Sequence, residues 1–359
     1  MSKTKKKWLK PRHRVVTAIL RWPVHLYCIL KYGIRIKRYK KREQCLILYN
    51  HQTAFDQFFV GLAFRDPVYY LASEDLFSNG WVSSLIKYLV EPIPIKKQTT
   101  DVKAILNCIR VAREGGYGVH PRWSDVVRRG RMKGGVSRVI YPDEYAAMTD
   151  EQMFEAIRTE LYVDEAVVDG TYRHKKTAEY LERAIYVCPY CGLAEFESHD
   201  DVIECKKCGR KVRYLPTKEL EGVGYEHPFR FVADWYAYQS DFTNSLDVSL
   251  YNDAPMFTDI ADLREVIPYE SKKLLAEGAT IQLYGNRMVI TMADGTLDMP
   301  YDSVDAVAVL GRNKLNIYYD GRIYQIKPGK RFCALKYVHM YHRYKNICKG
   351  EQNVKFLGL

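Results

Sequence analysis

A short stretch of the sequence, LYNHQTAFDQFF at residues 48–59, places His51 and Asp56 five positions apart between two apolar runs. An imidazole that is held at one nitrogen by a carboxylate can take a proton from a substrate hydroxyl at its other nitrogen. The same spacing suits a polar turn that starts a helix, and it recurs at His120 and Asp125. Spacing alone therefore does not separate a catalytic pair from a structural one.

The elements around the two pairs differ. The run CLILYNH predicts a buried strand, and TAFDQFFVGLAF predicts a helix with Thr53 as its N-cap and Asp56 in capping-box spacing. His51 then lies in the loop between strand and helix, one turn before Asp56. His120 follows a Gly-rich stretch and precedes a proline, with no apolar strand leading into it. The setting therefore favours His51 as the candidate base.

A basic feature follows about forty residues after this pair. The segment YLVEPIPIKKQTT passes from an apolar run through Ile93-Pro94-Ile95 to Lys96 and Lys97. From Val102 onward the apolar spacing of DVKAILNCIRVAREGG predicts an amphipathic helix. Lysines that leave a strand near a helix N-terminus form a plausible anion site.

Taken together, NHQTAFD, PIPIKK and AILNCIRVAREGG resemble the 1-acylglycerol-3-phosphate acyltransferases, a glycerolipid acyltransferase family, over roughly residues 14–140. The resemblance implies an α/β fold with a mixed sheet, His51 as general base on a glycerolipid hydroxyl and Asp56 as the residue that orients it. It places Lys96 and Lys97 at the substrate phosphate. It also implies a lysophospholipid acceptor and an acyl-CoA or acyl-carrier-protein thioester donor.

The resemblance is incomplete in two places. Lys97 stands where the family usually has arginine, which keeps the charge but loses the bidentate guanidinium fork. The family's second phosphate motif, of the form Pro-Glu-Gly-x-Arg, occurs nowhere in the chain, and AREGG runs straight into YGVHPRWSD. We therefore expect an internally shortened domain whose sheet lacks strands and exposes apolar edges.

Two CxxC pairs form a second candidate site. Thirteen residues separate the pairs, and the four cysteines are Cys188, Cys191, Cys205 and Cys208. Gly192 and Gly209 follow the pairs and allow the tight turns that bring two thiolates to one ion. We expect a structural Zn²⁺ site in a zinc ribbon, with His199 as a solvent-facing loop residue; a redox dithiol is the lesser alternative.

The positive charge of the chain lies at its N-terminal end. Residues 1–42 hold 15 Lys and Arg and no acid, whereas the remainder is close to neutral. The apolar stretch Val15 to Leu30 is interrupted by Arg21, Pro23 and His25, so it is too short and too polar to span a bilayer. It predicts a helix in the interface of an anionic membrane, kinked near Pro23; a core helix with a solvated basic tail is the alternative.

The C-terminal region predicts a β-rich module. From about Thr280, short β-type runs alternate with Gly-Asn and Asp-Gly turn signals, and residues 330–345 predict a closing helix. This pattern resembles a pleckstrin-homology or GRAM-like module that docks on a membrane or a protein; a partner-binding β-barrel without lipid contact is equally compatible. A capping box at Thr149 and Gln152 opens a helical linker over 149–183.

These patterns predict an α/β acyltransferase-type domain, a small β zinc ribbon and a β-rich domain closed by a helix. The expected segments are 1–42 (basic interface segment), 43–147 (acyltransferase), 148–184 (helical linker), 185–215 (zinc ribbon), 216–268 (mixed connection), 269–349 (PH/GRAM-like) and 350–359 (tail). The scattered remaining cysteines fit a reducing compartment, so we expect a cytoplasmic protein peripheral to the membrane. The rivals are an inactive membrane adaptor and, against the placement of the basic residues, a nucleic-acid-binding zinc ribbon.

Overall fold

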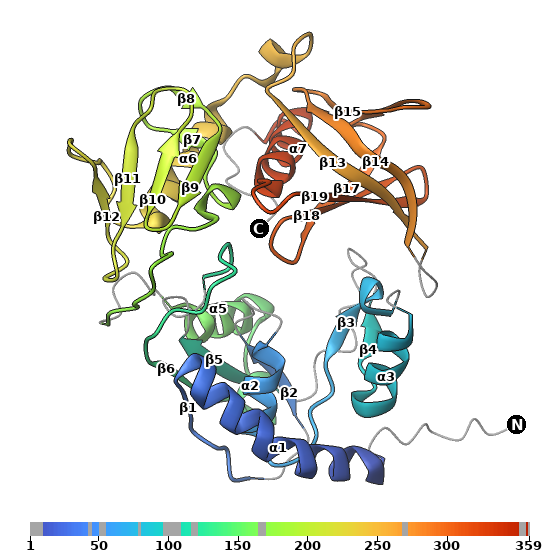
Figure 1. The fold of residues 1–359 in the computed structure, drawn as a ribbon. Coiled ribbons are helices and arrows are strands. Elements are labelled where there is room, and N and C mark those ends of the chain that lie inside the picture. Colours follow the sequence, from blue (N-terminus) through green and yellow to red (C-terminus); the bar gives the residue numbers. More distant parts are fainter. Residues whose placement is uncertain are drawn as a thin grey trace, which may run out of the picture. The chain divides into compact units, whose positions relative to one another are not determined.

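Figure 1 shows the chain in a computed structural model. The structure describes residues 10–41, 45–49, 55–77, 80–95, 109–115, 121–163, 170–267, 272–351 and 357. The chain forms two compact units: unit 1 comprises Met1–Pro121 and Val127–Tyr172, and unit 2 comprises Arg122–Val126 and Arg173–Leu359. Five residues that lie within the first half of the sequence therefore belong to the second unit.

Unit 1 begins with the long helix α1 (Pro11–Tyr32). Proline suits the first helical position because its missing N–H has no partner there. The helix ends at Gly33, whose φ of 62° is left-handed and whose N–H donates to Ile29 O. A side chain at Gly33 would also meet Gly130 O at 2.5 Å, so glycine is required for this close approach.

The sheet of unit 1 is mixed, as predicted. Its strands are β1 (Ile34–Ile36), β2 (Leu46–Tyr49), β5 (Ile109–Gly115) and β6 (Met132–Val139). Their order is β1-β6-β5-β2, with parallel pairing of β1 to β6 and of β2 to β5, and antiparallel pairing of β5 to β6. The helix α2 (Asp56–Ala63) buries Phe59 and Leu62 in one cluster with Cys28 and Tyr32 of α1.

The other elements of unit 1 are short. They are β3 (Leu71–Ser73), η1 (Glu74–Phe77), α3 (Trp81–Val90), β4 (Ile93–Ile95), α4 (Pro142–Ala146) and α5 (Asp150–Leu161). β3 and β4 form a separate parallel pair. The Ile-Pro-Ile segment is thus a strand, as the sequence predicts.

Two secondary-structure predictions for unit 1 are corrected. The helix expected from Val102 onward is a strand over the part that is described, Ile109–Gly115, because β5 supplies ladder partners to both β2 and β6. Pairing with two neighbours outweighs the helical spacing of its side chains. The strand β2 exists as predicted, but it is half-buried at the edge of the described sheet rather than fully buried.

The linker prediction holds in part. Thr149 caps α5 with a complete capping box: its hydroxyl accepts from Gln152 N at 3.3 Å, and its N–H donates to Gln152 Oε1 at 2.9 Å. The helix ends at Leu161, however, and the described residues 170–183 contain only the 3₁₀ turn η3 (Leu181–Arg183). The helical expectation for 149–183 is therefore correct only over α5.

The first part of unit 2 is a set of short strands packed on one helix. The strands are β7 (Val187–Cys188), β8 (Gly192–Leu193), β9 (Phe196–His199), β10 (Val202–Cys205), β11 (Lys211–Tyr214) and β12 (Leu220–Gly222). The helix α6 (Val232–Ser245) places Trp235 against them, and its indole Nε1–H donates to Val187 O at 2.8 Å. The short strands around the cysteine pairs fit the small β-type domain that the sequence predicts there.

The second part of unit 2 is one antiparallel sheet that curls into a half-barrel (Figure 1). After the turn η4 (Val248–Tyr251), its strands are β13 (Phe257–Val266), β14 (Lys272–Leu283), β15 (Arg287–Met292), β16 (Gly295–Pro300), β17 (Val304–Leu310), β18 (Lys314–Tyr319) and β19 (Arg322–Pro328). The order is β16-β15-β14-β13-β19-β18-β17. The closing helix α7 (Ala334–Cys348) fills the concave side, burying Tyr337, Met340 and Tyr341 in its core.

Candidate active site and metal centre

Asp56 is a buried residue at the start of α2 in unit 1. β2 ends at Tyr49 and α2 begins at Asp56, so His51 falls in the sequence between a strand and a helix, as predicted. Asp56 is 3% exposed and is the first residue of the helix. A carboxylate in the first turn is stabilised by the positive end of the helix dipole. His51 lies outside the described residues, and its pairing with Asp56 stays a prediction.

The capping box predicted for α2 is corrected. The residue before the helix is Phe55, and no side chain caps it. Asp56 therefore stands at the first helical position instead of the third, which rules out Thr53 as the N-cap. The aromatic side chain of Phe55 packs instead with Tyr32 of α1, at 5.6 Å between ring centroids.

The second His-x4-Asp pair has a structural role on its aspartate side. Asp125 Oδ1 accepts from Arg183 Nη1 at 2.7 Å and from Arg312 Nη1 at 2.8 Å, all within unit 2. Burial alone would raise the pKa of Asp125, but the two guanidinium groups outweigh it and lower the pKa. Asp125 is thus committed to arginine, while His120 lies outside the described residues.

The structure describes the strand that precedes the predicted phosphate site. β4 pairs with β3 from Leu71↔Ile93 to Ser73↔Ile95, and Ile93 N donates to Tyr70 O at 2.8 Å. β4 ends at Ile95, and the two lysines follow it directly in the sequence. Lys96 and Lys97 themselves lie outside the described residues, so their role stays a prediction.

The four predicted metal ligands come together. The Sγ atoms of Cys188, Cys191, Cys205 and Cys208 all lie within 4.8 Å of one another. Cys188 and Cys208 are 3.8 Å apart, and Cys191 and Cys205 are 3.6 Å apart. A tetrahedral Zn²⁺ with bonds of about 2.3 Å requires sulfur atoms roughly 3.8 Å apart. The distances therefore fit one zinc ion and exceed the bond length of about 2.05 Å in a disulfide.

The turns around the cysteines explain how the thiolates converge. Gly192 and Gly209 have φ values of 76° and 72°, in the left-handed region that favours glycine. Burial alone would raise the pKa of Cys208, but hydrogen bonds from Arg210 outweigh it and bring the pKa to about 7. The Arg210 guanidinium also lies 4.1 Å from the Tyr190 ring centroid. This cation offsets the negative charge that four thiolates bring to one Zn²⁺.

Two further observations indicate that a metal ion at this cluster would be structural. His199 is exposed at the end of β9, and its Nε2 lies 3.1 Å from Glu197 Oε1, so it stands apart from the cysteine cluster as predicted. Four sulfur ligands complete a tetrahedron and leave no position for a substrate. The centre can hold the ribbon together but offers no open site for chemistry.

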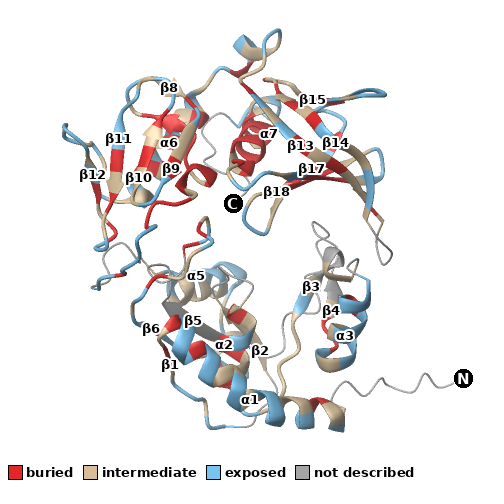
Figure 2. Ribbon diagram, viewed as in Figure 1, coloured by how far each residue is buried: buried red, intermediate tan, exposed pale blue. Residues whose placement is uncertain are grey.

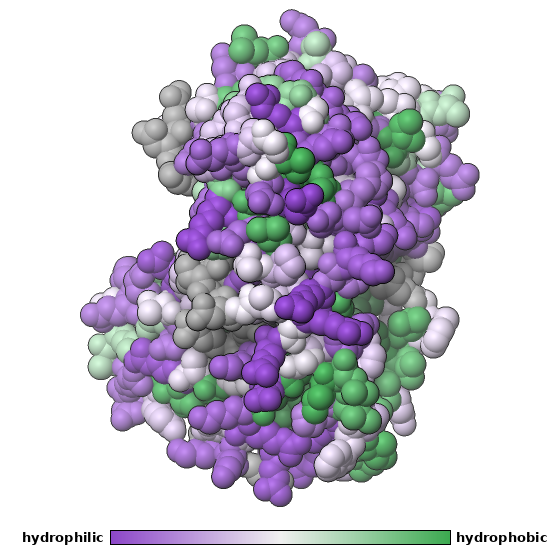
Figure 3. Space-filling model, turned by 60° about the vertical axis from the view of Figure 1, so that its left-hand side comes forward, coloured by the Kyte–Doolittle hydropathy of each residue, from purple (hydrophilic) through white to green (hydrophobic). Residues whose placement is uncertain are grey.

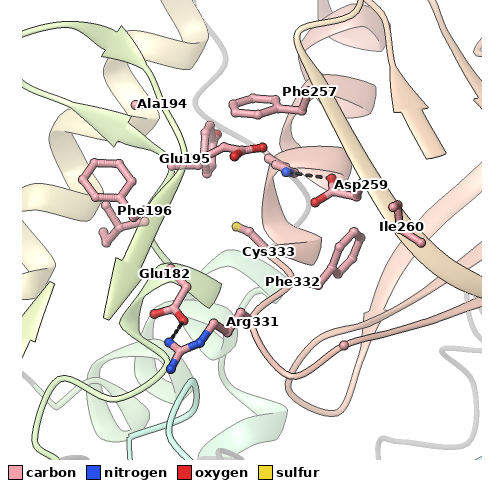
Figure 4. A pocket seen from close by; sticks show the side chains of 14 residues that line it. Glu182, Ala194, Glu195, Phe196, Phe257, Asp259, Ile260, Arg331, Phe332 and Cys333 are labelled. Atoms are coloured by element: carbon pink, nitrogen blue, oxygen red, sulfur yellow. Dashed lines mark hydrogen bonds and ion pairs between the residues drawn. The ribbon is translucent and has the colours of Figure 1, made fainter. Parts of the chain in front are cut away.

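Unit 2 also contains a cavity of about 260 Å³, drawn in Figure 4. Four of its charged groups form two ion pairs: Lys336 Nζ lies 2.7 Å from Asp259 Oδ2, and Arg331 Nη1 lies 2.6 Å from Glu182 Oε1. Cys333 borders the same space, and burial raises the pKa of its thiol to about 11. At neutral pH this thiol is protonated, so the cavity does not present an activated nucleophile.

Sequence reasoning missed the long-range polar networks of unit 2. His339 of α7 lies between two tyrosine hydroxyls, with Tyr186 at 2.7 Å from Nδ1 and Tyr236 at 2.9 Å from Nε2. Arg183 reaches Asp125 across 58 positions of sequence. No local pattern signals such pairs, because each partner comes from a different element.

The comparisons with known proteins agree with the geometry of unit 1. Residues 33–121 match the family model described as Acyltransferase. The match contains both the His51–Asp56 pair and the two lysines, and it ends at Pro121, where the chain leaves unit 1. None of the curated proteins matches the chain. Residues 33–121 therefore carry an acyltransferase domain, which supports acyl transfer as the general function.

Proposed function

We propose that this chain transfers a fatty acyl group from a thioester donor to the free hydroxyl of a lysophospholipid such as 1-acylglycerol-3-phosphate. One observation carries the proposal: the acyltransferase match covers His51 and the buried Asp56, which lie in the sequence between strand β2 and the first residue of helix α2. The aspartate of the other His-x4-Asp pair in the chain, Asp125, is bound by Arg183 and Arg312.

The proposed reaction uses the two side chains in sequence. His51 takes the proton of the acceptor hydroxyl as its oxygen attacks the thioester carbonyl, which gives a tetrahedral oxyanion. Collapse of this intermediate breaks the carbon–sulfur bond, and the imidazolium returns the proton to the leaving thiolate. Asp56 orients the imidazole and stabilises its positive charge. Lys96 and Lys97 hold the phosphate of the acceptor as point charges.

Membrane docking through α1 belongs to the same proposal. Large apolar side chains project from one side of the helix at steps of three and four residues. They are Val15, Ile19, Trp22, Leu26 and Leu30, and they are 56–77% exposed. Figure 2 shows the same helix largely coloured as exposed. Among the described residues, no helix has the length and apolar character to cross a bilayer. An interfacial position on the cytoplasmic face suits this helix.

The C-terminal part of unit 2 adds a second docking element to the proposal. The seven-stranded curled sheet and its closing helix α7 are compatible with the PH-like module that the sequence predicts. We assign it a docking role toward a membrane or a protein, by analogy of fold. The zinc ion, held by four cysteines, stabilises the adjacent ribbon.

The test compares acceptors that differ only in the phosphate. Purified full-length protein is given acyl-CoA or acyl-carrier protein with 1-acylglycerol-3-phosphate or monoacylglycerol on anionic vesicles. The proposal predicts transfer to the phosphorylated acceptor and at least about tenfold slower transfer to monoacylglycerol. Replacing Lys96 and Lys97 together by alanine should remove that preference. Equal rates with both acceptors in the unaltered protein would contradict the phosphate assignment.

One observation favours a second candidate function. The second phosphate motif of the resembled family is absent from the chain, so the domain lacks part of the expected anion site. An inactive acyltransferase domain that serves as a membrane adaptor would keep vesicle binding and the zinc ion but transfer no acyl group with any donor or acceptor. That outcome of the same assay would replace the enzymatic proposal.

A further inference from the structure

The helix α3 has its apolar side turned outward. Of its ten residues, Trp81 is 76% exposed, Leu85 45% and Tyr88 59%, whereas the buried residue is Ser83. The three exposed residues follow the spacing i, i+4, i+7 and so share one side of the helix. An amphipathic helix of a globular protein normally turns this stripe toward the core. In α3 the one buried residue is the polar Ser83, on the opposite side from the stripe.

Hydrogen bonding explains the inverted orientation. Ser83 Oγ donates to Leu76 O at 2.7 Å, which anchors the polar side of α3 to the turn η1. The apolar side chains of α3 belong to none of the buried clusters among the described residues. The hydrogen bond of Ser83, on the opposite side of the helix, thus helps to hold the stripe outward.

α3 is joined to α1 at the N-terminal end of α1. Lys10 Nζ lies 2.5 Å from Glu91 Oε2, next to the C-terminus of α3. The Arg12 guanidinium lies 4.6 Å from the Tyr88 ring centroid. His13 is 2% exposed, and its Nδ1 lies 2.8 Å from the Tyr69 hydroxyl, which anchors the same end of α1. These contacts join α1 and α3, so the two exposed stripes lie on a connected pair of helices.

The charges of the two helices indicate what kind of surface they bind. Neither helix contains an acid, while α1 carries Arg12, Arg14, Arg21 and Lys31, and α3 carries Lys87. Tryptophan and tyrosine are enriched where a bilayer meets water; a tryptophan stands in each stripe, and Tyr88 stands in that of α3. On unit 1 in Figure 3, hydrophobic side chains gather beside hydrophilic ones. Apolar side chains bordered by cations complement an anionic lipid surface.

We propose that α3 is a second interfacial helix, which docks together with α1 on an anionic phospholipid bilayer. The proposal rests on the membrane docking of α1 put forward above and extends it to a segment 50 residues further along the chain. A helix of ten residues is about 15 Å long, so it lies on the surface rather than crossing it. Two helices fix the orientation of unit 1 on the bilayer, whereas one helix would leave it free to rotate about its axis.

The experiment reads the position of Trp81 directly. In the full-length protein with Trp8 and Trp22 replaced by phenylalanine, Trp81 is the exposed tryptophan, because Trp235 is buried and Trp123 half-buried. Vesicles of phosphatidylcholine and phosphatidylglycerol, with or without brominated acyl chains, are then added. The proposal predicts a blue shift and quenching by the brominated lipid. Leu85→Glu should weaken vesicle binding about tenfold or more.

Matched variants separate the possible outcomes. Leu250→Glu alters an equally apolar residue of unit 2 that is 74% exposed, and vesicle binding should not change. In the first protein, Trp81 could remain unquenched while Trp22 is quenched in a Trp81→Phe protein. That result would show that α1 docks without α3 and would overturn the role of α3. A dimer in solution that Leu85→Glu dissolves would assign the stripe to a second copy of the chain and overturn the lipid assignment.

Failure of docking and failure of the enzyme remain distinguishable. Transfer from acyl-CoA to a short-chain, water-soluble lysophosphatidic acid needs no bilayer, so it reports on the acyl transfer proposal alone. Transfer without quenching of Trp81 contradicts the docking of α3, and quenching without transfer contradicts the enzymatic proposal.

Discussion

Arg183 Nη1 donates to Asp125 Oδ1 at 2.7 Å, and this contact distinguishes the two His-x4-Asp pairs of the chain. The Arg183 side chain is 3% exposed, and its Nη1 also donates to Trp123 O at 2.8 Å. The short segment Arg122–Val126 is thereby held in unit 2, although the residues on either side belong to unit 1. Asp125 is a structural carboxylate, which leaves Asp56 as the candidate partner of a catalytic histidine.

Removing the Asp125 carboxylate should destabilise unit 2. Asp125→Ala leaves the buried Arg183 without its anion, which costs about 3 kcal/mol in the free energy of unfolding. Urea unfolding followed by tryptophan fluorescence measures the change. As a control, Glu155→Ala removes an exposed partner of Arg158 and should cost less than about 0.5 kcal/mol. A small effect at Asp125 would show that Arg183 does not depend on it.

The same carboxylate should respond to acid. Because the pKa of Asp125 is lower in the folded state than in the unfolded state, its contribution is present above about pH 4 and is lost as the pH falls below that value. The difference in stability between the natural protein and Asp125→Ala should therefore shrink between pH 5 and pH 3. An unchanged difference would contradict the ionic nature of the contact.

Zinc removal should unfold the ribbon. We expect one Zn²⁺ per chain by elemental analysis, and a chelator should lower the melting temperature of unit 2 by roughly 10 °C or more. Cys205→Ser should lose the metal, because it removes one of the four sulfur ligands. Cys348→Ser is the matched control, since Cys348 is exposed in α7 and outside the cluster. A metal-free protein that melts at the same temperature would contradict the structural role.

Buried His339 should make unit 2 sensitive to mild acid. Burial lowers the pKa of His339 to about 3, below the unfolded value near 6.5. Between these values the unfolded state binds the extra proton, so stability falls as the pH drops, by up to roughly 1.4 kcal/mol per pH unit. Unfolding in urea at pH 7.5 and pH 5.5 measures this slope.

Two variants check the assignment of that slope. His339→Phe cannot take up the proton in either state, so it should be less stable at pH 7.5 but show a shallower loss on acidification. His199→Gln replaces an exposed histidine and should keep the original slope. Parallel slopes for all three proteins would assign the acid sensitivity to other groups.

Local chemistry in the sequence predicted the features that depend on neighbouring residues. The two CxxC pairs, the capping box at Thr149 and the short strands of the ribbon each depend on residues a few positions apart. The structure contains all of them. The strand before His51 and the helix after it were predictable for the same reason. The sequence therefore located the candidate site from its immediate elements.

The features that failed depend on distant partners. The segment Ile109–Gly115 has helical spacing but is a strand, because β2 and β6 lie on either side of it. α2 begins later than its capping signal, where Phe55 packs on Tyr32. The outward face of α3 depends on Ser83 and the carbonyl of Leu76. In each case a contact made by tertiary packing outweighs a local preference.

The most direct test of the central claim is acyl transfer from acyl-CoA to 1-acylglycerol-3-phosphate by the full-length protein and two histidine variants. The account predicts that His51→Ala loses at least about a thousandfold in rate, as expected for a general base, while His120→Ala keeps its activity. Both variants should retain zinc and bind vesicles. Equal activity in His51→Ala and the natural protein would contradict the assignment of His51 as the base.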